Sequence, residues 1–515
     1  MLLDKFKNMK KRYKVLLVGI FCILMLRICL SQEKKNEDAV LQKSNKIIQL
    51  TVQPDSIAKV PVNTGVFGIN LGFGFSRELD KDSAFVQLLR AAHPSSLRFP
   101  GGTVANYYHP NLPGYGYKSD EIIPSLGGLY NLQKKRTENI LYNYIRLCKA
   151  VNAQAVYCTN LLTGTTEEIL FVIAELKKNN VPIAGVELGN EFCLMPYRKE
   201  FPDAETYIQK AKTAALAIRA KYPELKLVVI AGDMVPANDK SARSKFMNAW
   251  NSAMSKESFY DAYAWHTYPN CANCDKDEFF DNLFTKNLKA IAPQTTNDLY
   301  RSGVDYIQQY GNKRKLWITE WNIGNFGFLD NTFVQAAYAS EFLLTMIDLN
   351  TKYNNYFEVS NLHSIEGLIN DRKSKQQPVL MVENEVPTTQ YFAYKFLAST
   401  LTNDVFRASE KILCADTSVS KNFICNTFIN KKDNKTYLHF VNRSGKKVQM
   451  TIKTALKTGL RITSIEAEYP YATTGRSAYE NGYPNKLKPV IYRDNELIKS
   501  NSVLIAPYSF GYISY

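Results

Sequence analysis

Short apolar runs alternate with amphipathic segments through most of the chain. Runs of strand length stand at residues 67–73, 96–102, 154–161, 183–191, 226–233, 260–269, 315–322 and 361–367. Helical periodicity fills several intervals between them, as at 166–180, 204–222 and 333–349. This alternation predicts an α/β fold, a (β/α)8 TIM barrel over residues 66–375. A doubly wound open sheet is the alternative, but polar residues gather at the C-terminal ends of so many strands that the barrel is favoured.

The pattern changes at about residue 376. Short alternating runs follow one another without helices, and turn signals such as "KKDNK" and "NRSGKK" separate them. Such a pattern predicts an all-β sandwich over residues 376–515. A further apolar run at 46–54 precedes the barrel and has no helix through which to pair. We therefore interpret residues 32–65 as a linker and an N-terminal strand that joins the sandwich.

Residues 1–31 have the composition of a targeting segment. A basic stretch is followed by the apolar run "VLLVGIFCILML", which is short for a membrane span and typical of a secretory signal peptide. We predict an exported protein that is periplasmic, secreted or membrane-anchored facing outside the cytoplasm. The alternative to a cleaved signal peptide is a signal anchor, which would tether the chain to the membrane through residues 15–30.

Charge and cysteine content narrow the functional class. The formal net charge is +16, and six of these charges belong to the leader. The rest are spread along the chain, so no nucleic-acid-binding stripe is predicted. Cys271 and Cys274 form the one CxxC motif, and without a second such motif we predict no metal and no cofactor. Export would permit disulfides there and at Cys414 and Cys425. Nothing in the sequence sets the oligomeric state.

Two strand-like runs end in a glutamate. "GVELGNEF" places Asn190 and Glu191 at the end of the fourth run, and "KLWITEWN" places Glu320 at the end of the seventh. Strand ends of a barrel meet at one mouth, where active sites lie. Glycosidic bond cleavage needs one carboxylic acid and one carboxylate beside the anomeric carbon. The pair therefore predicts a glycoside hydrolase that acts on an oligo- or polysaccharide.

The two motifs resemble those of the clan A retaining glycoside hydrolases. With the further motifs "LRFPGGT" and "HTY", they make the chain from residue 46 onward similar to the family 51 α-L-arabinofuranosidases, with families 39 and 79 as close alternatives. The resemblance implies that Glu191 is the acid/base and that Glu320 is the nucleophile of a double displacement. It further implies site roles for residues that bind the sugar or orient the nucleophile: Asn190, Arg98, His266 and Tyr268.

Two positions depart from the arabinofuranosidase pattern. Asn70 stands where that family has an acidic residue that grips the sugar, and Thr103 stands where it usually has asparagine. Trp321 could stack on a sugar or belong to the core. A β-xylosidase or a β-glucuronidase-type enzyme of the same clan remains an alternative, as does an inactive carbohydrate-binding protein. A metal-dependent hydrolase would need a histidine cluster, and the five histidines are scattered.

Overall fold

The computed structural model describes residues 47–72, 78–235, 239–268, 304–309, 314–323, 332–365, 381–383, 386–416, 419, 422–453, 459–467 and 491–515. The predicted leader at 1–31 and the CxxC motif at 271–274 lie outside these ranges. None of the helices within them has the length and hydropathy that crossing a membrane would require.

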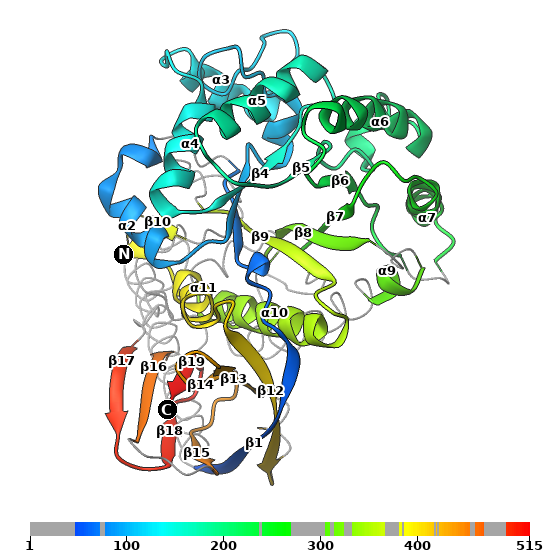
Figure 1. Ribbon diagram of the computed structural model, residues 1–515. Helices are drawn as coiled ribbons and strands as arrows, with labels where there is room; N and C mark the ends of the chain where they lie inside the picture. The colour runs from blue at the N-terminus through cyan, green and yellow to red at the C-terminus, as the bar shows by residue number, and fades with distance from the viewer. Residues whose placement is uncertain are drawn as a thin grey trace, which may run out of the picture.

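Eight parallel strands close into a barrel in chain order (Figure 1), so the predicted TIM barrel is confirmed. The strands are β2 (Gly68–Asn70), β3 (Ser96–Phe99), β4 (Gln154–Cys158), β5 (Ile183–Glu187), β6 (Leu227–Ile230), β7 (Ala262–Thr267), β8 (Lys315–Trp321) and β9 (Phe357–His363). Most end several residues before the predicted run does, because the apolar pattern continues into buried βα loops.

Helices cover the outside of the barrel in Figure 1. They are α2 (Ser83–Ala91), α3 (Gly127–Gln133), α4 (Ile140–Val151), α5 (Thr166–Lys178), α6 (Ala204–Lys221), α7 (Ala242–Ser255), α9 (Val304–Gln309) and α10 (Phe333–Lys352). Their starts follow local chemistry: Thr165 and Glu168 form a capping box on α5, and Asp203 caps α6. These caps explain why the predicted starts of both helices agree closely with the observed ones.

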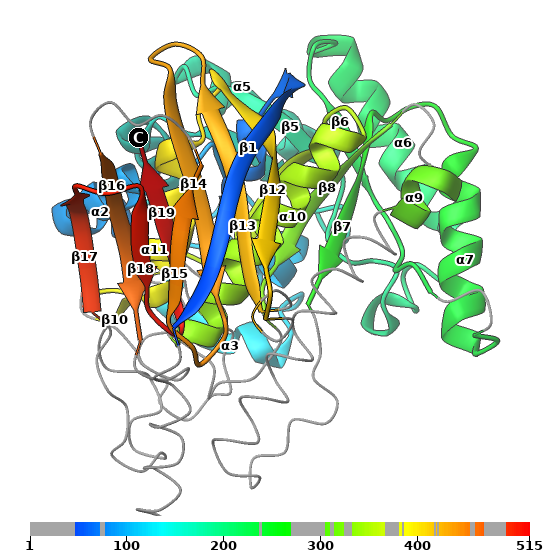
Figure 2. The same cartoon turned by 90° about the horizontal axis from the view of Figure 1, so that it is seen from below.

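A nine-stranded sheet forms the second part of the molecule, in the order β17-β16-β19-β14-β13-β12-β1-β15-β18 (Figure 2). Its members are β1 (Ile48–Pro61), β12 (Val405–Cys414), β13 (Phe423–Asn430), β14 (Lys435–Asn442), β15 (Val448–Ile452), β16 (Leu460–Glu466), β17 (Ile491–Ile498), β18 (Ser502–Ile505) and β19 (Ser509–Ser514). The N-terminal β1 pairs with β12 and with β15, so the chain reaches this sheet before it enters the barrel.

The sheet encloses its own apolar core, to which β1, β13–β16, β18 and β19 all contribute, as expected for the predicted sandwich. Cys425 lies in this core and Cys414 packs against it. Both are free thiols in the structure.

Two helices lie between the barrel and the sheet (Figure 1). α10 contacts β1, β14 and β19, and it also packs on α11 (Thr389–Thr400). α11 corrects the sequence analysis, which expected only strands after residue 376. A short β10–β11 pair (Met381–Glu383 with Val386–Pro387) precedes it. Nine of the twelve α11 residues are buried, so the segment lacks the one-sided polarity from which a helix is predicted.

Candidate active site

Glu191 and Glu320 meet at the mouth of the barrel. An oxygen of each carboxylate and a ring nitrogen of His266 all lie within 4.8 Å of one another. Glu320 lies within β8, the seventh barrel strand, as predicted. Glu191 lies four residues beyond the last residue of β5, the fourth strand, rather than on the strand itself. It adopts a left-handed backbone conformation with φ of 57°, which is uncommon for a residue other than glycine.

Both oxygens of Glu320 accept hydrogen bonds. Arg98 Nη1 donates to Oε1 at 2.7 Å, and the Tyr268 hydroxyl donates to Oε2 at 2.7 Å. Burial favours the neutral carboxyl, but the charges of His266 and Arg98 and the Tyr268 hydrogen bond outweigh it, so the pKa of Glu320 is lowered far below its usual range. Glu320 is therefore an ionised carboxylate that is held in one orientation.

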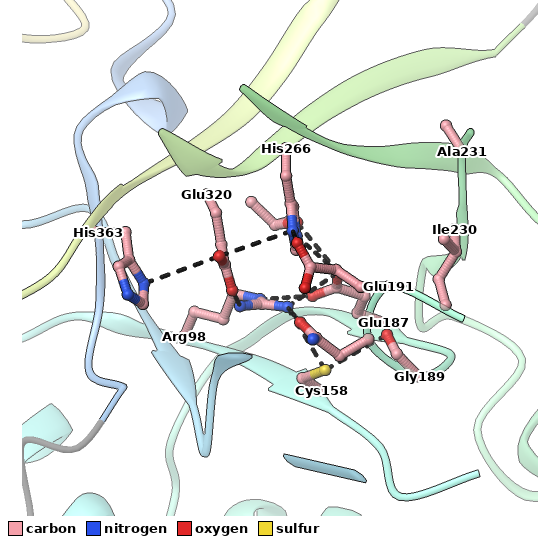
Figure 3. A network of polar contacts seen from close by, with 12 residues as sticks. Arg98, Cys158, Glu187, Gly189, Glu191, Ile230, Ala231, His266, Glu320 and His363 are labelled. Atoms are coloured by element: carbon pink, nitrogen blue, oxygen red, sulfur yellow. Dashed lines mark hydrogen bonds and ion pairs between the residues drawn. The ribbon is translucent and has the colours of Figure 1, made fainter. Parts of the chain in front are cut away.

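Arg98 is the fully buried cation beneath this carboxylate (Figure 3). It extends from β3 and donates through Nε to Glu187 Oε2 at 2.6 Å, as well as to Glu320. Its Nη2 donates to Asn190 Oδ1 at 2.8 Å. One guanidinium thereby fixes the relative positions of the fourth and seventh strand ends, as a planar fork of donors allows.

His266 connects the two glutamates from β7. Its Nδ1 lies 2.9 Å from Glu191 Oε1 and 3.6 Å from Glu320 Oε2. Its Nε2 lies 3.1 Å from the Thr319 hydroxyl. Burial disfavours the imidazolium, but the carboxylates around it prevail and raise the pKa of His266 to about 10. Glu191, His266 and Glu320 thus bring two carboxyl groups and an imidazole together, a set of side chains that can exchange protons.

Two asparagines line the same mouth. Asn190 Nδ2 is buried and has no hydrogen-bond partner among the described residues, and the Asn190 carbonyl accepts from Asn106 Nδ2 at 3.0 Å. Asn70 ends β2, where its Oδ1 accepts from the Gly72 amide at 3.0 Å, while its Nδ2 has no partner within the part of the chain that the structure describes. Unpartnered buried donors are costly, so they mark positions where a bound ligand can supply an acceptor.

Trp321 lies away from this cluster. Its ring stacks on Phe342 of α10 at 4.3 Å between centroids, and its indole nitrogen donates to Ser360 at 2.8 Å. Trp321 follows Glu320 in β8, and neighbouring residues of a strand point to opposite faces. Of the two alternatives that the sequence left open, the core position is the one in the structure, so we leave Trp321 out of the site.

The structure adds residues that the sequence analysis did not single out. Glu187 is buried at the end of β5 and binds Arg98, although it stands in the same "GVELGNEF" motif as Glu191. Thr319 donates to Glu187 Oε1 at 3.0 Å. His363 ends β9 with Nδ1 3.9 Å from Glu320 Oε2. An acid inside an apolar run was the available signal for Glu187, whereas His363 needed the closed barrel to be placed.

Comparisons with known proteins agree with this architecture. No family model and no curated protein sequence matches the chain. Among solved structures, a family 51 α-L-arabinofuranosidase from Bifidobacterium longum is similar at a TM-score of 0.63 and 12% identity, over 91% of this chain and 100% of that one. The family 51 arabinofuranosidase from Xanthomonas axonopodis pv. citri gives a TM-score of 0.62 at 14% identity, over 91% and 99%.

A third similar structure is a xyloglucanase of glycoside hydrolase family 44 from Paenibacillus polymyxa. Its TM-score is 0.57 at 13% identity, and the match covers 91% of this chain and 99% of that one. At such identities the comparisons confirm the fold that the resemblance implied, a barrel joined to a β-sheet domain.

Proposed function

We propose that this protein is a retaining glycoside hydrolase. The observation that carries the proposal is that one carboxylate oxygen of Glu191 and one of Glu320 lie within 4.8 Å of each other at the barrel mouth. Retaining enzymes place their two carboxyl groups about 5–5.5 Å apart, whereas inverting enzymes leave roughly 6.5–9.5 Å for a water molecule. The short separation favours direct attack by one carboxylate on the anomeric carbon.

The environments of the two acids assign their roles. Glu320 is buried and ionised, with Arg98 and Tyr268 holding its oxygens, so it is the nucleophile. Glu191 is 28% exposed and hydrogen-bonded to His266, so it can exchange protons with solvent. Glu191 protonates the leaving oxygen as Glu320 bonds to the anomeric carbon. It then removes a proton from the water that releases the sugar from Glu320.

The sugar in the subsite beside Glu320 is, on this proposal, a pentose, with arabinofuranose as the leading candidate. The similar structures named as arabinofuranosidases and the "LRFPGGT" and "HTY" motifs support it. The Asn70 and Asn190 amides, which have no partner among the described residues, are suitable donors for sugar hydroxyls. A β-xyloside or a β-glucuronide is the alternative substrate within the same clan.

A panel of nitrophenyl glycosides tests the activity. It contains the arabinofuranoside, xyloside, glucuronide, fucoside and glucoside, each assayed with the wild type and with Glu320→Ala. We expect turnover of at least one pentoside, abolished in the variant. Glucuronide turnover without pentoside turnover would replace the proposed sugar. Binding of glycosides without any turnover would replace the enzyme with a carbohydrate-binding protein.

We also propose that the protein is exported and that the mature chain begins near Gln32. The basic stretch and the short apolar run of residues 1–31 support this. N-terminal sequencing of the exported protein tests it. A chain that still begins at Met1 would indicate a signal anchor and a membrane tether instead.

A further inference from the structure

Glu187 is a buried carboxylate to which the two-glutamate mechanism gives no role. Glu187 is the last residue of β5, and its side chain is 1% exposed. Arg98 donates to both of its oxygens, at 2.6 Å and 3.1 Å. The Thr319 hydroxyl donates to Oε1 at 3.0 Å, and His266 Nε2 lies 3.8 Å from the same oxygen.

These contacts place Glu187 between Arg98, which binds Glu320, and His266, which binds Glu191 (Figure 3). Through Arg98 it is linked to Glu320, and through His266 it is linked to Glu191. The Thr319 hydroxyl donates its proton to Glu187, so the Thr319 oxygen is available to accept a hydrogen bond from His266 Nε2. A protonated His266 donates through both ring nitrogens, so Glu187 and Thr319 supply acceptors on the Nε2 side while Nδ1 faces Glu191.

The other titratable groups around this cluster are neutral or paired. Burial raises the pKa of the Cys158 thiol and of the Tyr268 hydroxyl, so both keep their protons. Burial lowers the pKa of His363, so its ring is uncharged near neutral pH. Asp233 lines the same pocket as Glu187, Glu191 and His266, and it is paired with Arg243 from α7.

The groups that remain are two cations, Arg98 and His266, and the carboxyl groups of Glu187, Glu191 and Glu320. Separating unbalanced charge inside a protein is costly, so a buried cluster tends toward neutrality. With Glu187 and Glu320 ionised, neutrality leaves the proton on Glu191, which is the state that a general acid must have before the reaction starts.

We propose that Glu187 is a positioning residue whose negative charge balances the buried cations and so keeps the proton on Glu191. The inference rests on the proposed function, because it concerns the protonation state of the acid in that mechanism. It differs from a purely structural role for Glu187, which would anchor Arg98 without affecting the pH at which Glu191 loses its proton.

Two substitutions of opposite sign test the proposal. Glu187→Gln removes a negative charge at constant shape, and we expect the alkaline limb of the kcat/KM–pH profile to move to lower pH by about one unit. His266→Gln removes a positive charge, and we expect the same limb to move to higher pH. The profiles are measured with whichever nitrophenyl glycoside of the panel the wild type hydrolyses best.

Glu341→Gln is the matched control. Glu341 is a buried carboxyl on α10 that pairs with Arg443, away from the mouth. Its loss should lower thermal stability and leave the pH profile in place.

Three results would count against the proposed function or the role of Glu187. A wild type inactive on the whole panel would overturn the proposed function and, with it, this inference. An active wild type whose alkaline limb stays unchanged in Glu187→Gln, or shifts the same way in both variants, would overturn the role of Glu187 alone. If Glu187→Gln does not fold, the His266→Gln profile tests the charge balance on which the role of Glu187 depends. An alkaline limb that moves to higher pH supports the charge balance. A limb that stays in place or moves to lower pH refutes it.

Discussion

The two sides of the barrel mouth hold their glutamates in different ways. Glu320 lies within β8, is 5% exposed as a residue, and has both oxygens bound by Arg98 and Tyr268. Glu191 stands on a left-handed turn beyond β5, and its side chain is 28% exposed. A nucleophile needs a fixed charge and a fixed position. An acid/base needs access to water and a proton it can lose and regain, so the difference matches a division of labour.

The largest expected effect is that of replacing Glu320, the glutamate whose two oxygens are both held by hydrogen bonds. In the proposed mechanism, Glu320→Ala removes the atom that bonds to the anomeric carbon, so kcat/KM on every active glycoside should fall by roughly 10⁵-fold. Azide can enter the vacated space and attack directly, and we expect a glycosyl azide of inverted configuration by NMR. Undiminished activity in Glu320→Ala would show that another group is the nucleophile.

Replacing Glu191, the more exposed glutamate, should reduce activity by an amount that depends on the leaving group of the substrate. Glu191→Ala removes the proposed proton donor, so glycosides with poor leaving groups should lose about 10²–10⁴-fold in kcat/KM. A dinitrophenyl glycoside, which leaves without protonation, should still form the intermediate and give a burst of phenolate. Azide should then yield a product of retained configuration. Equal losses for good and poor leaving groups would contradict the acid role.

A smaller effect is expected from the hydrogen bond that holds the nucleophile. Tyr268→Phe removes a donor to ionised Glu320, and hydrogen bonds to charged groups contribute about 1.5–3 kcal/mol, or roughly 10–100-fold in rate. Loss of a bond to the charged form raises the pKa of Glu320. The acid limb of the kcat/KM–pH profile should therefore move to higher pH. A limb that stays in place would mean that Tyr268 does not stabilise the carboxylate.

The smallest expected effect concerns the floor of the mouth. Gly102 has φ of 59°, and a Cβ there would lie 3.6 Å from Glu320 Oε1. Gly102→Ala should cost about 1–2 kcal/mol in unfolding free energy and raise KM severalfold more than it lowers kcat. Gly128→Ala is the control, because nothing lies within 4 Å of the added methyl and its φ is ordinary. Equal effects of the two substitutions would place Gly102 outside the sugar site.

The sequence predicted the barrel and the two acids because each strand carries its own local signal. The run into Glu320 is apolar and β-branched up to the functional residue, and Glu191 follows a similar run. Arg98, Tyr268 and Asn190 came from motifs beside these strands, and the structure places all three around the two glutamates.

The remaining features depend on contacts between segments distant in the sequence. His363 could be placed beside Glu320 only by the closed barrel, and the bonds of Glu187 to Arg98 and Thr319 likewise join different strands. Trp321 faces α10 rather than the mouth because strand alternation, and not residue type, decides its side. α11 was missed because it is enclosed by α10 and the sheet, so its apolar residues show no preferred face.

The stereochemistry of the wild-type reaction tests the central claim most directly. The glycoside that the panel shows to be active is hydrolysed in the NMR tube, and the first anomer of the released sugar is recorded before mutarotation. With carboxylate oxygens within 4.8 Å, the account predicts two displacements and therefore a product of retained configuration. A first product of inverted configuration would contradict the assignment of Glu320 as nucleophile and Glu191 as acid/base.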